Sequence, residues 1–91
     1  MSQFELQTTK NFARDVRDLD VQTKQRLNNK MGNMRSLGMP SDVDAVHCAP
    51  GCYRTKVGDY RLVFRVQEST FQLVFFCPRR DVYERLKRRL A

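Results

Sequence analysis

The 91-residue chain contains no long hydrophobic run, no repeat and no low-complexity segment. No apolar stretch approaches the roughly 18 residues that a membrane-spanning helix needs, so the sequence predicts no membrane partner. The first ten residues also lack the basic and then apolar layout of a signal peptide, and we therefore expect a cytoplasmic protein. A length of 91 residues predicts a single domain that covers residues 1–91.

Three cysteines are too few for a disulfide framework, and their number is odd. A reducing cytosol would keep Cys48, Cys52 and Cys77 as thiols. His47 beside Cys48, with Cys52 four residues on, resembles part of a metal site, but structural zinc sites usually need a second close pair of ligands. We therefore expect no metal and no cofactor, with the thiols packed in or near a core and His47 in a partnered loop.

Positive charge is concentrated in the second half of the chain. Residues 1–50 carry 7 basic and 6 acidic side chains, whereas residues 51–91 carry 10 basic and 4 acidic ones, and the whole chain has a net charge of +7. A localised excess of cations is expected on a surface that meets a polyanion. Composition leaves two alternatives open, because a basic surface also promotes solubility and can dock an acidic protein.

A short strand at residues 4–6 precedes two predicted helices. Thr8 or Thr9 is a suitable N-cap for the first helix and Asp20 for the second, which Gly38 ends. We expect the two helices to lie as an antiparallel hairpin across a sheet, because each carries apolar residues at helical spacing. These residues are Phe12, Val16 and Leu19 in the first helix, and Val21, Leu27, Met31 and Met34 in the second.

Beyond residue 51 the hydrophobic period changes to that of β-strands. Three runs dense in β-branched and aromatic residues predict strands at 52–57, 60–66 and 71–77. Gly58-Asp59 predicts a tight hairpin with a positive φ at its first position, and residues 68–70 predict the second turn. Residues 41–51 are rich in turn formers and predict an irregular connection.

A last amphipathic helix is predicted from Asp81, with Val82, Leu86 and Leu90 on its apolar side. The expected fold is therefore α+β: a two-helix hairpin packed on an antiparallel sheet, in the order strand, two helices and three strands, with a short C-terminal helix.

The hairpin register sorts the strand side chains onto two faces. With Gly58-Asp59 as the loop, Lys56 stands directly opposite Arg61, and successive side chains alternate between the faces. The face expected under the helices carries Tyr53, Thr55, Val57, Tyr60, Leu62 and Phe64. The other face carries Arg54, Lys56, Arg61, Val63 and Arg65 and is expected to be basic.

Like charges that face each other across a ladder cost up to about 1 kcal/mol, so folding does not require Lys56 opposite Arg61. An anion held between the two side chains would account for the arrangement, and the overall excess of cations agrees with it. The alternative is a solvated face whose side chains splay apart or are neutralised by Asp81 or Glu84.

The third strand leads into Arg79-Arg80 and, one turn later, Tyr83. Arginine can hold a phosphate through two donors, and tyrosine can stack on a base or hydrogen-bond to a hydroxyl group. In the alternative, Tyr83 anchors the last helix and the arginines are solvated. Candidates for less specific contacts with RNA phosphates are Arg65, Arg80, Lys87 and Arg88.

Residues 52–64, CYRTKVGDYRLVF, resemble the central hairpin of RelE/ParE-superfamily toxins, and residues 79–83, RRDVY, resemble the motif that ends their last strand. The leading helices and the strand order also fit, so the resemblance covers most of the chain. RelE-branch toxins belong to type II toxin–antitoxin modules, enter the ribosomal A site and cut mRNA without a metal. The resemblance therefore implies an mRNA endonuclease (an mRNA interferase) whose partners are mRNA, the 70S ribosome with its ribosomal RNA, and a cognate antitoxin.

The resemblance assigns catalytic roles to Arg54, Lys56, Arg61, Arg79 and Tyr83. This set favours the RelE branch, because the ParE branch shares the fold but poisons DNA gyrase and generally lacks the full set of cations. Many relatives carry Gly-His where this chain has Cys77-Pro78. Some use a carboxylate and a terminal histidine as acid and base, and here Tyr83 stands at the second position while the first has no evident equivalent. The choice between Arg79 and Arg80 as the active arginine stays open.

Cleavage of RNA without a metal can use the 2′-hydroxyl of the substrate as the nucleophile. Cations suit this reaction because the transition state carries more negative charge than the ground state. Lys56 is expected to act as base or charge stabiliser, while Arg61 and Arg79 hold the phosphate. Arg54 positions the backbone or assists proton transfer, and Tyr83 orients the nucleotide. The alternatives are a gyrase inhibitor and a non-catalytic module that binds RNA or protein.

Overall fold

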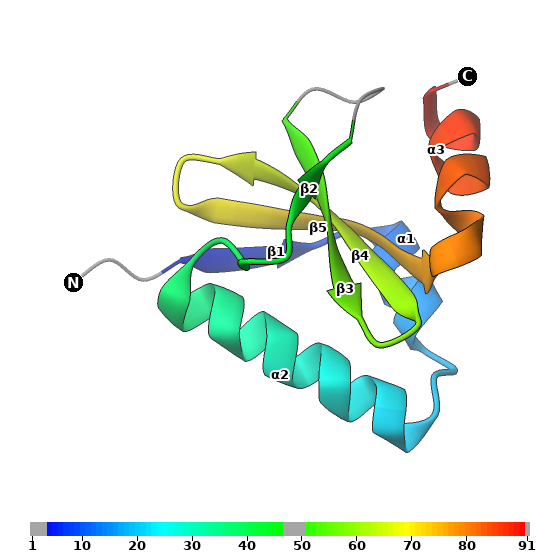
Figure 1. The fold of residues 1–91 in the computed structure, drawn as a ribbon, viewed down its shortest axis with the longest axis horizontal. Coiled ribbons are helices and arrows are strands. Elements are labelled where there is room, and N and C mark those ends of the chain that lie inside the picture. Colours follow the sequence, from blue (N-terminus) through cyan, green and yellow to red (C-terminus); the bar gives the residue numbers. More distant parts are fainter. Residues whose placement is uncertain (1–3, 47–50, 91) are drawn as a thin grey trace.

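The computed structural model describes residues 4–46 and 51–90 and arranges them around a five-stranded sheet (Figure 1). The strands lie side by side in the order β1-β5-β4-β3-β2. In chain order the elements are β1 (Glu5–Thr8), α1 (Lys10–Val16), α2 (Val21–Leu37), β2 (Asp44–Ala45), β3 (Cys52–Val57), β4 (Tyr60–Gln67), β5 (Thr70–Pro78), the 3-10 turn η1 (Arg79–Asp81) and α3 (Val82–Leu90). The predicted α+β architecture and the C-terminal helix are confirmed. Within the described residues, no helix is long and apolar enough to cross a membrane.

The helix ends lie close to where their capping residues predicted them. The Thr9 hydroxyl accepts a hydrogen bond from the Phe12 N–H at 3.2 Å, and an Asp20 carboxylate oxygen accepts one from the Thr23 N–H at 3.2 Å. Both caps satisfy backbone donors that have no partner inside the helix. Gly38 ends α2 with a φ of 90°, a conformation that favours glycine.

The apolar stripes are shorter than the sequence predicted. α1 ends at Val16, so Leu19 lies beyond the helix, where it still packs against the core. Val21 is 78% exposed and does not belong to the buried stripe, because it lies in the first turn of α2. Leu27 and Met34 are buried as predicted.

The sheet is mixed, which corrects the expectation of an antiparallel one. β1 runs parallel to β5, with Leu6 opposite Phe71. Alternating hydrophobicity at residues 4–6 marked a strand but carried no information about the direction of a partner so distant in the sequence. β2 pairs antiparallel with β3 inside the segment predicted to be irregular, since a two-residue strand has no detectable period.

The β3-β4 hairpin has the predicted register. Lys56 pairs with Arg61 across a two-residue loop, and Gly58 adopts a φ of 62°. The next turn is shorter than the predicted residues 68–70. Glu68 adopts a φ of 53°, which closes the turn in two residues, and Thr70 already belongs to β5.

The face of the sheet that packs on α1 and α2 holds the main hydrophobic core. The aromatic rings of Phe64 and Phe71 meet edge to face with centroids 5.5 Å apart. The buried members of this core are Phe12, Leu27, Met34, Val57, Leu62, Phe64, Phe71, Leu73 and Phe76. The side chains assigned to this face by the hairpin register are therefore the ones that the helices cover, with Tyr53 and Tyr60 at its margin.

α3 packs on the opposite face, where Val82 and Leu86 are buried. A β-bulge opposite Val63 allows the consecutive residues Val74 and Phe75 to join this second core together. Val63 itself is 1% exposed. The face predicted to be basic is therefore so only in part: it is apolar beneath α3, where Val63 is buried, and Lys56, Arg61 and Arg65 remain exposed or partly exposed beside this second core.

α1 seals the edge of β5 beyond the end of β1, whose pairing with β5 stops at Leu73. The Thr9 hydroxyl lies 2.9 Å from the carbonyl oxygen of Leu73 and 3.0 Å from that of Val74. The Asp15 carboxylate accepts a hydrogen bond from the Phe76 N–H at 3.0 Å. Two side chains of the helical segment thus replace a missing strand, which leaves these edge groups paired.

A buried hydroxyl joins three segments on the α2 side of the sheet. Thr55 is 1% exposed, and its hydroxyl donates to an Asp42 carboxylate oxygen at 2.7 Å, which also lies 3.1 Å from the Lys30 ammonium nitrogen. Burial alone would raise the pKa of Asp42, but the hydrogen bonds from Thr55 and Lys30 outweigh it and hold this pKa below its ordinary value. The contacts fix β3 against α2 and the loop that follows it.

Replacing Thr55 by Val removes this hydrogen bond and conserves the side-chain shape. We expect the free energy of unfolding at pH 7 to fall by about 1–2 kcal/mol, measured by urea denaturation. The native pKa of Asp42 lies below its unfolded value of about 3.9, so the stabilisation is complete above that pH and is lost as the pH falls through the native pKa.

The difference between wild type and Thr55→Val should therefore shrink as the pH falls through the lowered native pKa of Asp42. Thr23→Val removes a similar but exposed hydrogen bond to Asp20 and is the matched control, for which we expect a smaller loss. An equal loss in both variants, or a loss that does not change with pH, would contradict the assignment.

Candidate functional site

Basic side chains meet at the end of the sheet where the β3-β4 hairpin turns and β5 runs into η1. Lys56 and Arg61 form a cross-strand pair, and Arg61 also lies opposite Cys77 of β5. The Arg79 N–H donates to the Asp59 carbonyl at 3.0 Å, which ties the start of η1 to the hairpin turn. We call this region, formed by Lys56, Arg61, Arg79 and the Gly58-Asp59 turn, the hairpin tip.

The Arg61 guanidinium is fixed above the turn by backbone carbonyls. Its Nη1 donates to the carbonyl oxygen of Tyr60 at 2.9 Å and to that of Gly58 at 3.3 Å. Lys56, its partner across the ladder, is exposed. In the described part of the chain neither Lys56 nor Arg61 forms an ion pair, so neutralisation by Asp81 or Glu84 does not occur there.

An open hollow of about 460 Å³ lies between the hairpin turn and η1. Its lining residues are Asp59, Tyr60, Pro78, Arg79 and Arg80. The Tyr60 ring is a fixed wall, because it stacks on Phe76 with centroids 4.9 Å apart. Arg79 and Arg80 both line the hollow, so their positions do not decide which of the two is the active arginine. Asp59, which the sequence indicated only as a turn residue, adds a carboxylate to the lining of the hollow.

α2 contributes a cation that was not predicted from the sequence. A Cβ added to Gly58 would lie 2.7 Å from the Arg26 Nη1, so this guanidinium lies against the hairpin turn. Helical periodicity places Arg26 only on an exposed face, and no local pattern connects it with a turn much later in the chain. The tip therefore receives an arginine side chain from α2 in addition to those of β4 and η1.

Arg54, Tyr83 and Arg65 lie outside the hairpin tip as defined above. Arg54 is one pleat back along β3, opposite Val63. Tyr83 lies in the first turn of α3 and is 69% exposed, which favours a free ring over a buried helix anchor. Arg65 lies four residues from Arg61 along β4, roughly 13 Å away at strand spacing, and so is not part of the tip.

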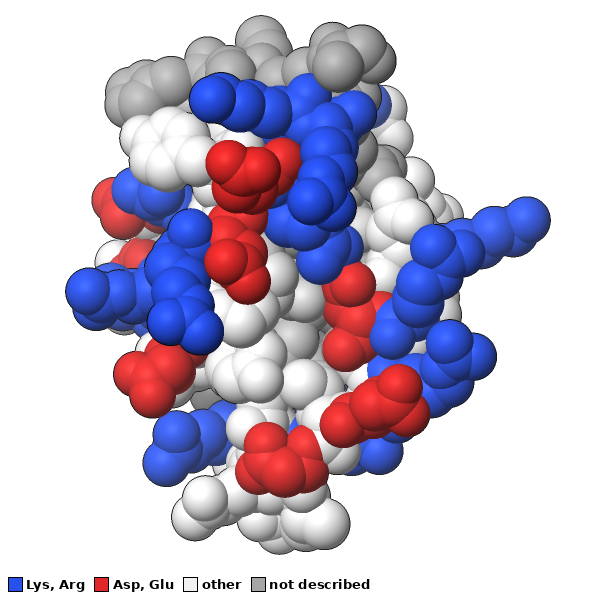
Figure 2. Space-filling view, turned by 90° about the vertical axis from the view of Figure 1, so that its right-hand side faces the viewer, with Lys and Arg blue, Asp and Glu red and all other residues white. Residues whose placement is uncertain are grey.

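Lys87 and Arg88 are exposed and belong to the second half of α3. Figure 2 shows the side of the molecule on which α3 lies, and Lys and Arg side chains cover much of it with Asp and Glu interspersed. The basic surface thus extends beyond the hairpin tip.

The two cysteines in the described part of the chain offer no nucleophile near the tip. Cys77 is buried, and desolvation raises the pKa of its thiol to about 11, so it stays protonated at neutral pH. Cys52 is half-buried beside the second core. His47 and Cys48 lie outside the described residues. Among residues 4–46 and 51–90, no group of three metal-ligating side chains comes together.

The arrangement of helices and strands is that of RelE-type toxins. The E. coli toxin RelE, as a double arginine-to-alanine mutant in the free state, superposes with a TM-score of 0.75 at 18% identity, over 99% of this chain and 100% of that one. RelE of the archaeal RelE–RelB complex from Pyrococcus horikoshii gives 0.74 at 18% identity, over 86% and 97%. The E. coli DinJ–YafQ toxin–antitoxin complex gives 0.70 at 14% identity, over 90% and 99%.

No protein-family model and no curated protein sequence matches the chain. At identities of 14% to 18%, the structural likeness establishes the fold. The fold implied by the hairpin and tail motifs is therefore confirmed, with the C-terminal helix included.

Replacing Gly58 by Ala tests what the turn requires. We expect a loss of about 1–2 kcal/mol in the free energy of unfolding, measured by urea denaturation, because a φ of 62° places an L-residue in the left-handed region. The contact with Arg26 involves the end of a flexible side chain, which can move aside. Adding Arg26→Ala should therefore recover little of the loss, and full recovery would show that the contact excludes a side chain at Gly58.

Proposed function

We propose that the chain is the toxin of a type II toxin–antitoxin module and that it cleaves mRNA on the ribosome. The observation that carries the proposal is a cross-strand pair of cations, Lys56 and Arg61, that no described carboxylate neutralises. Folding gains nothing from two like charges held opposite each other, so a bound polyanion is the natural partner. The RelE-type fold supports the same conclusion, since RelE and YafQ are toxins.

The reaction needs no metal in this proposal. The 2′-oxygen of the substrate attacks the adjacent phosphorus, the bond to the 5′-oxygen breaks, and a 2′,3′-cyclic phosphate and a 5′-hydroxyl are formed. One proton leaves the 2′-hydroxyl and one is delivered to the departing oxygen. The protein must therefore orient the attacking group, stabilise charge on the phosphoryl oxygens and carry both protons.

The geometry favours distinct roles for the cations. Arg61 is held over the turn by the Gly58 and Tyr60 carbonyls, so it offers a preorganised guanidinium for the phosphate. Arg79 is tied to the same turn through its backbone and would hold the phosphate from the other side. Lys56 is exposed in the free chain and is suited to stabilise the developing charge, while proton abstraction by it would need a site closed by the substrate.

Two further residues would act on the nucleotide itself. Arg54, on the same face of β3 as Lys56, would position the RNA backbone or assist proton transfer. The exposed Tyr83 ring is free to stack on a base or to orient it. The remaining RNA contacts would come from Arg80 and from the basic residues of α3.

The proposal implies a set of partners. RelE–RelB and DinJ–YafQ are complexes of a toxin with its antitoxin, which supports a cognate antitoxin for this chain. The substrate would be mRNA in the A site of the 70S ribosome, where ribosomal RNA surrounds it. The chain would meet the ribosome in the cytoplasm. No cofactor is required.

Primer extension on a reporter mRNA, with the protein induced in a bacterial host, tests the proposal. We expect discrete in-frame cuts, and we expect Lys56→Ala and Arg61→Ala each to lower cleavage by about 10²- to 10³-fold, as when one charge-stabilising donor is removed. Arg35→Ala removes an exposed arginine from the last turn of α2 and is the matched control.

Undiminished cleavage in both soluble variants would contradict the cation assignment. Arrested growth with intact transcripts would instead point to gyrase or another protein target. Circular dichroism of each variant distinguishes lost activity from lost structure.

A further inference from the structure

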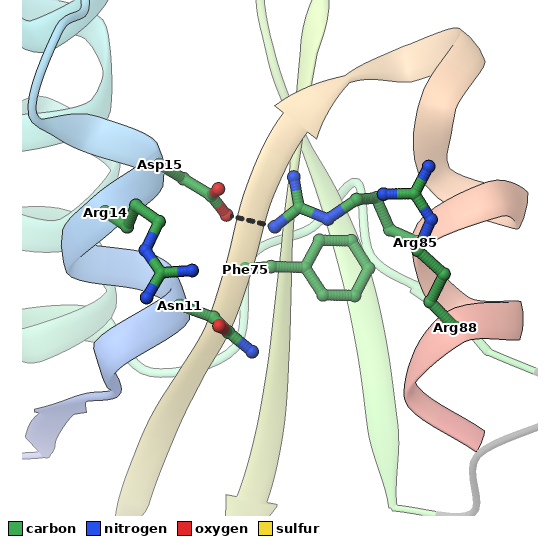
Figure 3. Close-up of a pocket in the computed structure, with 6 residues that line it drawn as sticks. All are labelled: Asn11, Arg14, Asp15, Phe75, Arg85 and Arg88. Carbon is green, nitrogen blue, oxygen red and sulfur yellow. Dashed lines mark hydrogen bonds and ion pairs between the residues drawn. The ribbon is translucent and has the colours of Figure 1, made fainter. Parts of the chain in front are cut away.

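A second basic pocket lies between α1 and α3 and shares no residue with the hairpin tip (Figure 3). It has a volume of about 380 Å³, and its lining residues are Asn11, Arg14 and Asp15 of α1, Phe75 of β5, and Arg85 and Arg88 of α3. Figure 3 shows Asn11 and Arg14 projecting from one wall while Arg85 reaches across from the other. Two segments from opposite ends of the chain therefore build this pocket.

One ion pair connects the two walls of the pocket. An Arg85 guanidinium nitrogen lies 2.6 Å from an Asp15 carboxylate oxygen, and the same oxygen accepts the hydrogen bond from the Phe76 N–H. The Arg85 guanidinium also lies over the Phe75 ring, 5.0 Å from its centroid. The Asp15 side chain is only 12% exposed. These contacts hold α3 against α1 and neutralise the one carboxylate that lines the pocket.

Two arginines are left without a counter-charge. The lining contains three arginines and one aspartate, so its net charge is +2. Across the part of the chain that the structure describes, neither Arg14 nor Arg88 forms an ion pair. Asn11 adds a neutral amide beside Arg14, which can donate hydrogen bonds to an anion. The pocket therefore offers unpaired donors on both walls around a neutralised centre.

We propose that this pocket binds a phosphate group of an RNA backbone, held between Arg14 on α1 and Arg88 on α3. The planar guanidinium matches phosphate oxygens through paired hydrogen bonds, which gives a firmer grip than a single ammonium group. Contacts of this kind position a protein on a nucleic acid without reading its sequence. The inference rests on the proposed function and adds an anchoring site that orients the chain while the hairpin tip acts.

The lining favours RNA over an acidic protein segment. An amphipathic helix that docks in a groove needs exposed apolar surface to cover. The one apolar residue here, Phe75, is 1% exposed and already lies beneath Arg85. What the pocket offers to a ligand is therefore charge and hydrogen-bond donors, which is the chemistry of phosphate recognition.

Fluorescence anisotropy with the purified full chain and a fluorescein-labelled RNA duplex, measured over a range of salt concentrations, tests the inference. We expect the double variant Arg14→Gln/Arg88→Gln to bind at least about 10-fold more weakly at low salt. Losing one phosphate contact should also reduce the slope of log K against log[salt] by roughly 0.7–0.9. The double variant Lys24→Gln/Arg35→Gln removes the same number of positive charges from exposed positions on α2, outside the pocket, and should leave both quantities unchanged.

A wild-type affinity and slope in the double variant would overturn the inference. So would an equal loss of affinity for labelled polyglutamate, because the pocket would then bind acidic chains in general. Failure of the proposed function is separable: transcripts would stay intact in the host while the difference in RNA affinity between wild type and double variant persists. Neither substituted side chain forms an ion pair with another described residue, so urea midpoints should match that of the wild type.

Discussion

The two-residue turn at Gly58-Asp59 is the constraint on which the rest of the arrangement depends. Because side chains alternate along a strand, the register set by this turn decides which residues of β3 and β4 lie under α1 and α2 and which face the other way. A slip of β4 by one residue against β3 would turn Arg61 towards the core and expose Leu62. The turn also provides the Gly58 and Tyr60 carbonyls that hold Arg61, and the Asp59 carbonyl that holds η1. One local geometry thus fixes the core and the cation site together.

Much of this was predictable from the sequence, because the signals are local. Capping residues located the starts of both helices, and Gly-Asp between two strand-like runs set the hairpin and its opposed charges. The parallel pairing of β1, the short strand β2 and the bulge in β5 depend on distant partners or on too few residues to show a period. The burial of part of the basic face was missed for the same reason. Val74 and Phe75 are consecutive residues, and both contribute to the core on this face only because of the bulge.

In the candidate site, too, local patterns predicted some of the positions and tertiary contacts determined the others. Lys56 and Arg61 lie opposite each other as the hairpin register predicted, and the Arg79 backbone meets the same turn. Arg26 and Asp59 add groups to the tip through contacts between α2, the turn and η1, which no spacing in the sequence indicates. Arg14 and Arg88 line one pocket only because α1 takes the place of a strand beside β5 and α3 folds back over the same edge. Local patterns therefore located the tip, and tertiary packing determined its surroundings.

The chemistry of the RNA ends is the measurement that tests this account most directly. Purified protein would be added to ribosomes that translate a defined mRNA, with or without a 2′-O-methyl group at the nucleotide that precedes the cut. The account predicts a 2′,3′-cyclic phosphate on the upstream fragment, a 5′-hydroxyl on the downstream fragment, and no cleavage of the methylated message. Equal cleavage of both messages, or a 5′-phosphate on the downstream fragment, would contradict it.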